Sequence, residues 1–286
     1  MKTVILSKVG LVIIFLCGIV QLSAQDAKQI ESELKSAFEN RELQLRNPYV
    51  ANKLEFDSRG QLLRSSETGP WTTYGFFRVN QLTIKNEELE IDGKRMILVL
   101  ESKSSVPILY PRKPAPKFTA LITDLPLRII VKMRDQTGGA VRDSLSQILQ
   151  GGSIEERLAT YWTPRVDLAE AIRSQPSQGD VAGVLEGKRE VYLPGARHIQ
   201  PPRAVYTPDP GYPPEAHNKH LSGTLVVAAI INEQGFPELL ETIHRSIEGF
   251  DAVVLAKVSR WRFHPALMDG KPVPVLVNVE VNFKSN

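Results

Sequence analysis

The alternation of residues near the C-terminus constrains the fold more than any other feature of this sequence. Between residues 273 and 284, apolar residues occupy every second position, and Asn278, Glu280 and Asn282 are among the residues between them. Successive side chains of a strand point to opposite faces of a sheet. The segment is therefore predicted to be a strand with one buried face and one face that is mostly wet.

The residues before this strand supply its partners. Residues 224–231 are apolar and rich in β-branched side chains, which indicates a strand covered on both faces, and a turn at 232–235 joins it to a second strand at 238–246. Apolar residues repeat at helical spacing over 250–261, and two prolines favour the start of a short helix at 215–221. The predicted order is α-β-β-α-β, with a small three-stranded antiparallel sheet.

Residues 25–173 are predicted to form a separate, β-rich α+β domain. Apolar residues at helical spacing predict a helix over 26–45, and a capping box at 153–156 predicts another helix. Alternating residues lead into and out of Asp92-Gly93, which predicts a hairpin turn there. The same kinds of pattern predict a strand over 127–133 and a helix over 167–173.

Residues 174–210 differ in composition from both flanking regions. They contain six prolines and four glycines. This composition is typical of a semi-extended linker, here with a short strand at 190–193. The chain is thus predicted to belong to the α+β class, with a linker at 174–210 between an N-terminal domain at 25–173 and a C-terminal domain at 211–286.

The first 24 residues have the layout of a secretory signal peptide. Lys2 and Lys8 precede a run of twelve apolar residues, 9–20. Twelve residues are fewer than the ~20 that a membrane-spanning helix needs. We expect cleavage after Ala24 and a periplasmic location; a retained inner-membrane anchor is the alternative. Cleavage would also remove Cys17, the only cysteine, so no disulfide or thiol chemistry is expected in the mature chain.

Charge and motifs argue against several classes of function. The net charge of +3 falls to +1 once Lys2 and Lys8 are removed, whereas a nucleic-acid-binding protein normally carries a basic stripe. The chain has no P-loop, dinucleotide-binding fingerprint or nucleophile elbow, so we predict no catalytic residues, no cofactor and no enzyme activity. His217 and His220 have a spacing compatible with a metal. Because no cysteine or acidic pair accompanies them, we predict surface histidines and no metal site.

The C-terminal region resembles the C-terminal domain of the TonB family over residues 212–284. Collinear motifs carry the resemblance: Tyr212-Pro213 with Glu215-Ala216, Ser222-Gly223-Thr224 before the apolar strand, the turn 232–235 with Asn232 in place of the usual Asp, Arg260-Trp261-Arg262-Phe263-His264-Pro265-Ala266, and Asp269-Gly270-Lys271-Pro272-Val273. The resemblance implies a domain that crosses the periplasm to outer-membrane receptors. Residues 26–173 show no comparable resemblance.

The resemblance also implies roles for particular residues. The family captures a short extended receptor segment, the TonB box, by pairing it to the last strand, a mode called β-augmentation. This implies a partner-binding edge formed by Tyr212, Pro213, Pro274, Val275, Leu276, Val277, Asn278, Val279, Glu280, Val281, Asn282 and Phe283. In the signature Arg260, Trp261, Arg262, Phe263 and Pro265, we expect the two rings to lie between helix and sheet, both arginines to face solvent, and Pro265 to end the helix.

These features together predict a periplasmic TonB-like protein of the cell envelope. It would bind outer-membrane receptors or other envelope proteins by strand addition and support transmembrane transport. A membrane-anchored energy transducer is one alternative, although the family's transducers carry a spanning helix with a polar face and a long proline-rich spacer that this sequence lacks. An envelope enzyme with a TonB-like adaptor is the second alternative. An open strand edge would also permit a homodimer.

Overall fold

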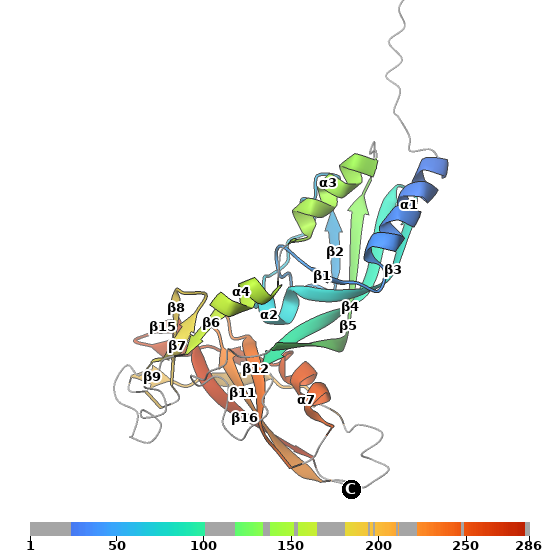
Figure 1. Cartoon of the computed structure of the whole chain (residues 1–286). Helices are drawn as coiled ribbons and strands as arrows, with labels where there is room; N and C mark the ends of the chain where they lie inside the picture. Colours follow the sequence, from blue (N-terminus) through green and yellow to red (C-terminus); the bar gives the residue numbers. More distant parts are fainter. Residues whose placement is uncertain are drawn as a thin grey trace, which may run out of the picture.

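Figure 1 shows the computed structural model of the chain. It describes residues 24–100, 118–133, 138–151, 154–164, 181–193, 195–196, 198–209, 211, 222–246 and 249–283. The described residues are mixed α+β, as the sequence predicts, with most of the regular structure in strands. One large sheet runs through both halves of the molecule.

Eleven strands form this sheet within the described residues. They are β1 (Glu42–Gln44), β2 (Lys53–Phe56), β3 (Phe76–Lys85), β4 (Glu88–Leu100), β5 (Phe118–Lys132), β6 (Trp162–Pro164), β7 (Val181–Leu185), β8 (Arg189–Tyr192), β11 (Gly223–Ile231), β12 (Pro237–Arg245) and β16 (Val275–Phe283). The order along the sheet is β1-β3-β4-β12-β11-β16-β8-β7-β6, and β5 pairs with both β4 and β2. The C-terminal strands therefore lie in the middle of the sheet.

Two helices pack on the N-terminal part of the sheet (Figure 1). Ile30 of α1 (Ala24–Phe38) and Leu145 of α3 (Gly138–Ile148) belong to one buried cluster with residues of β2, β3, β4 and β5. The sequence predicts that the first helix continues to residue 45, and this is wrong for its last part. Asn40 adopts a left-handed φ of 60°, and residues 42–44 then pair with β3.

The hairpin between β3 and β4 turns at Asn86 and Glu87, whose φ angles are 51° and 60°. Two positive φ angles give a turn whose twist matches that of the flanking strands. The predicted turn at Asp92-Gly93 is wrong, because both residues lie inside β4. A Cβ on Gly93 would lie 2.4 Å from the carbonyl oxygen of Arg78. This glycine therefore permits a close approach of two strands rather than a turn.

The C-terminal strands and helix follow the prediction closely. β12, β11 and β16 are neighbouring antiparallel strands, and α7 (Asp251–Val258) lies between β12 and β16 in the chain. Val254 and Val258 of α7 share a buried cluster with Leu225 and Val227 of β11 and Val279 of β16. Helix α7 therefore covers one face of these strands (Figure 1). The predicted helix at 215–221 lies outside the described residues, as does the one at 167–173.

N-terminal residues cover the opposite face of the C-terminal strands. Ala228 and Ile230 point away from α7, since they alternate with the residues that contact it, and they pack in a cluster with Met96 of β4. The same cluster includes side chains of α2 (Trp71–Tyr74), α4 (Ile154–Tyr161) and β6 to β8. β4 also pairs in parallel with β12, through Val99 opposite Leu240. The two halves of the chain thus share a sheet and a core.

The segment predicted as a linker, 174–210, contains several strands in its described part. β7 and β8 form a hairpin, β10 (Arg203–Tyr206) pairs with β13 (Arg262–His264), and β9 (Ile199–Gln200) joins β14 (Ala266–Met268) and β15 (Lys271–Val273). Two of its glycines have roles within this structure. Gly187 has a φ of 66° in the hairpin turn, and a Cβ on Gly183 would lie 2.4 Å from the Trp162 ring. Glycine content here reflects turns and close packing rather than an extended chain.

Candidate partner-binding edge of the C-terminal sheet

β16 has the alternation of burial that its sequence predicts. The odd-numbered residues of 279–283 are buried on the α7 side, whereas Asn278, Glu280 and Asn282 are exposed on the other face. The ring centroids of Phe250 and Phe283 are 5.0 Å apart in an edge-on arrangement. Packing on α7 therefore fixes which face of β16 is wet.

β11 occupies one edge of β16 along the whole strand, because the two strands pair without a register shift from Val275 to Phe283. One further hydrogen bond shows where the other backbone groups point: the N–H of Tyr192 donates to the carbonyl oxygen of Pro274 over 3.0 Å. In a strand, the N–H and C=O groups of alternate residues point to opposite edges. The even-numbered residues of β16 therefore direct their backbone groups away from β11.

Most of this outer edge has no strand partner among the residues that the structure describes. β8 lies parallel to β16 but pairs with it only where Tyr192 is opposite Val275. The sequence predicts an outermost strand over 274–283; in the structure β16 lies inside the strand order, because β8 closes its first residue. Residues 276–282 remain as an edge toward which Asn278, Glu280 and Asn282 direct N–H and C=O groups.

The exposed side chains beside this edge form a polar row. The hydroxyl of Thr224 donates to Oδ1 of Asn282 over 2.6 Å, and Nδ2 of Asn282 donates to Oε1 of Glu280 over 2.8 Å. These hydrogen bonds orient the carboxylate of Glu280 on the wet face of the strand. A strand added at this edge would lie beside polar and acidic side chains on one face of the sheet. Its other face would lie on the side of the sheet that α7 covers.

The opposite edge of the three C-terminal strands is partly occupied by a strand of the N-terminal half. β4 lies along β12, with Leu100 opposite Glu241, and the side chain of Glu241 is fully buried. The covering cluster of N-terminal residues extends over the same end of the sheet. β4 therefore occupies the β12 edge at Leu240 and Glu241, and among the described residues the longest unpaired stretch of edge on these three strands is 276–282 of β16.

Of the two aromatic residues of the signature motif, Trp261 packs against the buried cluster that α7 shares with β11 and β16, and Phe263 lies in β13. The ring centroids of Trp261 and Phe263 are 6.3 Å apart, and Nε1 of Trp261 donates to the carbonyl oxygen of Pro208 over 3.2 Å. The N–H of Phe263 donates to the carbonyl oxygen of Gly235 over 2.9 Å. Gly235 has a φ of 81°, and a Cβ there would lie 1.8 Å from the Phe263 carbonyl oxygen. Only glycine fits at this turn.

A comparison with protein-family models agrees with these motifs. A family model described as the C-terminal region of the Gram-negative bacterial TonB protein matches residues 208–285. The chain carries a TonB-family C-terminal domain. Among solved structures it matches the solution NMR structure of the Pseudomonas aeruginosa TonB CTD, at 22% identity over 32% of this chain and 91% of that chain, with a TM-score of 0.27. The search of curated proteins gives no match. The TonB-family domain indicates an envelope protein of the TonB-like kind.

Arg262 joins the TonB-like domain to the N-terminal half. Its guanidinium lies 4.1 Å from the ring centroid of Phe236 and donates a hydrogen bond to the hydroxyl of Tyr74, 188 residues away in the sequence. Arg260 lies 3.8 Å from the carboxylate of Asp124 in β5, which Lys257 also approaches. The prediction that both arginines face solvent is therefore wrong, since each contacts the N-terminal half.

Pro265 does not end the helix, although the sequence predicts that it does. Helix α7 ends at Val258, and the hydroxyl of the next residue, Ser259, donates to the carbonyl oxygen of Ala256 over 2.8 Å. The chain then forms β13 opposite β10, and Pro265 separates β13 from β14. Pairing with β10 explains why residues 262–264 are extended instead of helical.

A buried ionic cluster lies where α4, β8 and β12 meet. The carboxylate of Glu238, which is 1% exposed, accepts hydrogen bonds from the hydroxyl of Tyr161 at 2.8 Å and from Arg189 at 3.2 Å. Burial raises the pKa of Glu238. Burial and the nearby carboxylate of Glu238 both raise the pKa of Tyr161, well above its ordinary value. Burial opposes the charge on Arg189, but Glu238 and Glu233 outweigh it and raise its pKa. The cluster ties the N-terminal half to β12, and no motif in the sequence indicated it.

Several predicted features lie outside the described residues: the first 23 residues of the signal peptide, Tyr212 and Pro213 beside the edge, and His217 and His220. Over the part that is described, no helix is both long and apolar enough to cross a membrane. The described side chains also include no group of three or more His, Cys, Asp or Glu arranged to hold a metal.

Proposed function

We propose that this is a periplasmic TonB-like protein that binds an extended peptide of an outer-membrane receptor, or of another envelope protein, by adding it as a strand to β16. The observation that carries the proposal is the outer edge of residues 276–282, where backbone groups point away from β11 and no described strand pairs. An added strand satisfies such groups through main-chain hydrogen bonds, and the side chains beside it select the sequence. The protein would support transport by binding rather than by catalysis.

The geometry of the edge indicates what kind of peptide fits. Seven residues in a strand span roughly 23 Å at about 3.3 Å per residue, and β8 limits the peptide at Val275. Glu280 favours a basic or hydroxyl-bearing residue at the neighbouring peptide position and disfavours an acidic one, because like charges on adjacent strands repel. Tyr212 and Pro213 are proposed to flank the same edge, on the basis of the family resemblance.

Titration of the ¹⁵N-labelled full chain with TonB-box peptides tests this proposal. Amide shifts should concentrate on residues 276–282 and should be small on α3. A peptide that is N-methylated at the residues facing β16 keeps its side chains but loses donors, so it should bind at least about tenfold more weakly, as expected for the loss of one or two hydrogen bonds.

The matched control is the same peptide N-methylated at the alternate residues, whose N–H groups point away from β16. It should bind like the unmodified peptide. Glu280→Gln should keep strand addition and weaken the preference for basic peptides. Shifts concentrated outside β16 would contradict strand addition, as would equal binding of the two methylated peptides.

A further inference from the structure

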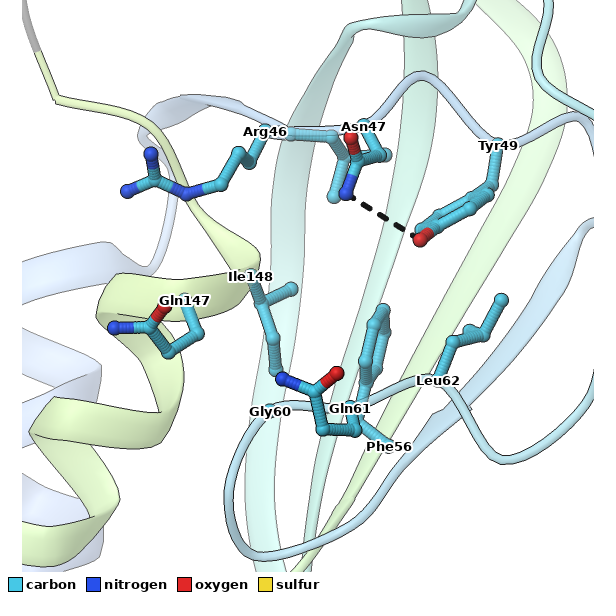
Figure 2. Close-up of a pocket in the computed structure, with 10 residues that line it drawn as sticks. Arg46, Asn47, Tyr49, Phe56, Gly60, Gln61, Leu62, Gln147 and Ile148 are labelled. Carbon is cyan, nitrogen blue, oxygen red and sulfur yellow. Dashed lines mark hydrogen bonds between the residues drawn. The ribbon is translucent and has the colours of Figure 1, made fainter.

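The N-terminal half contains a cavity that the proposed strand addition does not use. Its volume is about 170 Å³. It is lined by Leu45, Arg46, Asn47 and Tyr49 after β1, by Phe56, Gly60, Gln61 and Leu62 from the end of β2 onward, and by Gln147 and Ile148 at the end of α3 (Figure 2). All of these residues lie outside the TonB-family match at 208–285. The cavity is therefore a separate feature of the molecule.

Aromatic and aliphatic side chains form the inner wall of this cavity. The rings of Tyr49 and Phe56 have centroids 6.4 Å apart and are tilted by 51°, and Phe56 is almost fully buried. Leu62 and Ile148 complete the apolar lining (Figure 2). The electron-rich face of an aromatic ring attracts positively polarised hydrogens. Such a wall suits the C–H face of a ring that carries hydroxyl groups.

Amide side chains supply the polar part of the lining. Nδ2 of Asn47 faces the cavity (Figure 2) and donates to the hydroxyl of Tyr49 over 3.3 Å, and the second hydrogen of this amide group is left for a ligand. The side chain of Gln61 makes no hydrogen bond to any described residue, and Figure 2 shows it on the opposite side of the cavity from Asn47. An amide both donates and accepts hydrogen bonds, as a hydroxyl group does. Asn47 and Gln61 therefore complement a neutral, hydroxyl-rich molecule.

The charged group at this cavity is already engaged by the protein. The guanidinium of Arg46 donates to the carbonyl oxygen of Ser146 over 2.7 Å and approaches that of Leu149 at 3.5 Å. In Figure 2 its side chain points away from Tyr49 and Gln61. No carboxylate is among the lining residues. A neutral ligand is thus favoured over an anion or a cation.

The loop that carries Gln61 is held in place before any ligand binds. Oδ1 of Asp57 accepts hydrogen bonds from the N–H groups of Arg59 and Gln61 at 2.9 and 2.8 Å. A Cβ on Gly60 would lie 2.7 Å from Cβ of Gln147, so the loop packs directly on α3. A pre-formed site loses little conformational freedom on binding.

We propose that this cavity binds a neutral, hydroxyl-rich ligand of the size of one sugar ring. Its volume of about 170 Å³ is below the roughly 300 Å³ at which pockets for drug-sized ligands begin, yet it exceeds the space of a single water several-fold. The ring packs on Tyr49 beside the buried Phe56, and its hydroxyl groups exchange hydrogen bonds with Asn47 and Gln61. The site gives the N-terminal half a ligand of its own, independent of the strand added at β16.

Saturation-transfer NMR with the full chain tests this proposal, using methyl β-glucoside, N-acetylglucosamine and glutamate as separate probes. Ring protons of at least one sugar should receive saturation, and glutamate should receive none. Asn47→Ala and Gln61→Ala should each reduce the sugar signal about fivefold, because each removes one hydrogen bond. Gln81→Ala, which changes an exposed amide on β3 that does not line the cavity, should leave the signal unchanged.

Circular dichroism melts of the variants establish that each one folds. Leu62→Phe places a larger side chain in the cavity and should abolish the sugar signal while the peptide titration at β16 stays unchanged. The proposal is overturned if neither sugar receives saturation, if glutamate alone does, or if the sugar signal survives both amide substitutions in folded protein.

Discussion

Breaking the contact between Arg262 and Tyr74 should loosen the TonB-like domain from the N-terminal half. Arg262→Met keeps much of the apolar length but loses the hydrogen bond to the Tyr74 hydroxyl and the cation–π contact over Phe236. A hydrogen bond from a charged group contributes about 1.5–3 kcal/mol, and a partly desolvated cation–π contact contributes about 0.5–2 kcal/mol. Because methionine recovers some packing, we expect the free energy of unfolding to fall by about 2–3 kcal/mol.

Urea unfolding followed by tryptophan fluorescence and circular dichroism measures this loss. Tyr74→Phe removes the hydroxyl alone, so a double-mutant cycle with Arg262→Met should give a coupling energy of about 1–2 kcal/mol. Arg203→Met changes an exposed arginine on β10 and should stay within about 0.5 kcal/mol of the parent chain. A coupling energy below about 0.5 kcal/mol would refute the reasoning, since Arg262 would then behave as a solvated surface residue.

Three further substitutions test the physical account of the fold. Arg95 is fully buried and donates to three backbone carbonyl oxygens, and burial lowers its pKa to about 10. Arg95→Met should therefore lower the free energy of unfolding in urea by more than about 3 kcal/mol. A loss under about 1 kcal/mol would contradict this. Gly235→Ala should cost at least about 2 kcal/mol more than Gly270→Ala, because both glycines have positive φ but open space surrounds only Gly270; equal midpoints in urea would count against this difference. Burial raises the pKa of Glu238, so this carboxyl group binds a proton more readily in the folded state than in the unfolded chain. The stability of the parent chain relative to Glu238→Gln should therefore fall as pH rises above about 4. Thermal melts from pH 4 to 8 that show the opposite slope would contradict that sign.

Local patterns predicted the C-terminal elements well because each pattern reports the burial of its own side chains. Alternation located β16, the apolar run located β11, and helical spacing located α7. The same patterns say which face of a strand is buried and not which strand lies beside it. The parallel pairing of β12 with β4 could not be read from them, and neither could the single contact of β8 with Val275.

Long-range side-chain contacts account for the other differences. The signature arginines were expected in solvent because they were placed on the side facing away from the two rings, whereas Tyr74 and Asp124 approach them from the N-terminal half. Asp92-Gly93 is the strongest local signal for a turn. In the structure Gly93 instead allows two strands to approach closely, because it has no side chain. Residues that serve contacts between distant segments were therefore the ones that local reasoning missed.

Amide hydrogen exchange along β16 in the free, full-length chain tests most directly whether a partner strand has an edge to join. Val279 and Val281 direct their N–H groups to β11 and should exchange slowly. Asn278, Glu280 and Asn282 direct theirs to the outer edge and should exchange rapidly until a peptide is added. Slow exchange of both sets in the free chain would mean that the edge is already occupied and would contradict strand addition at β16.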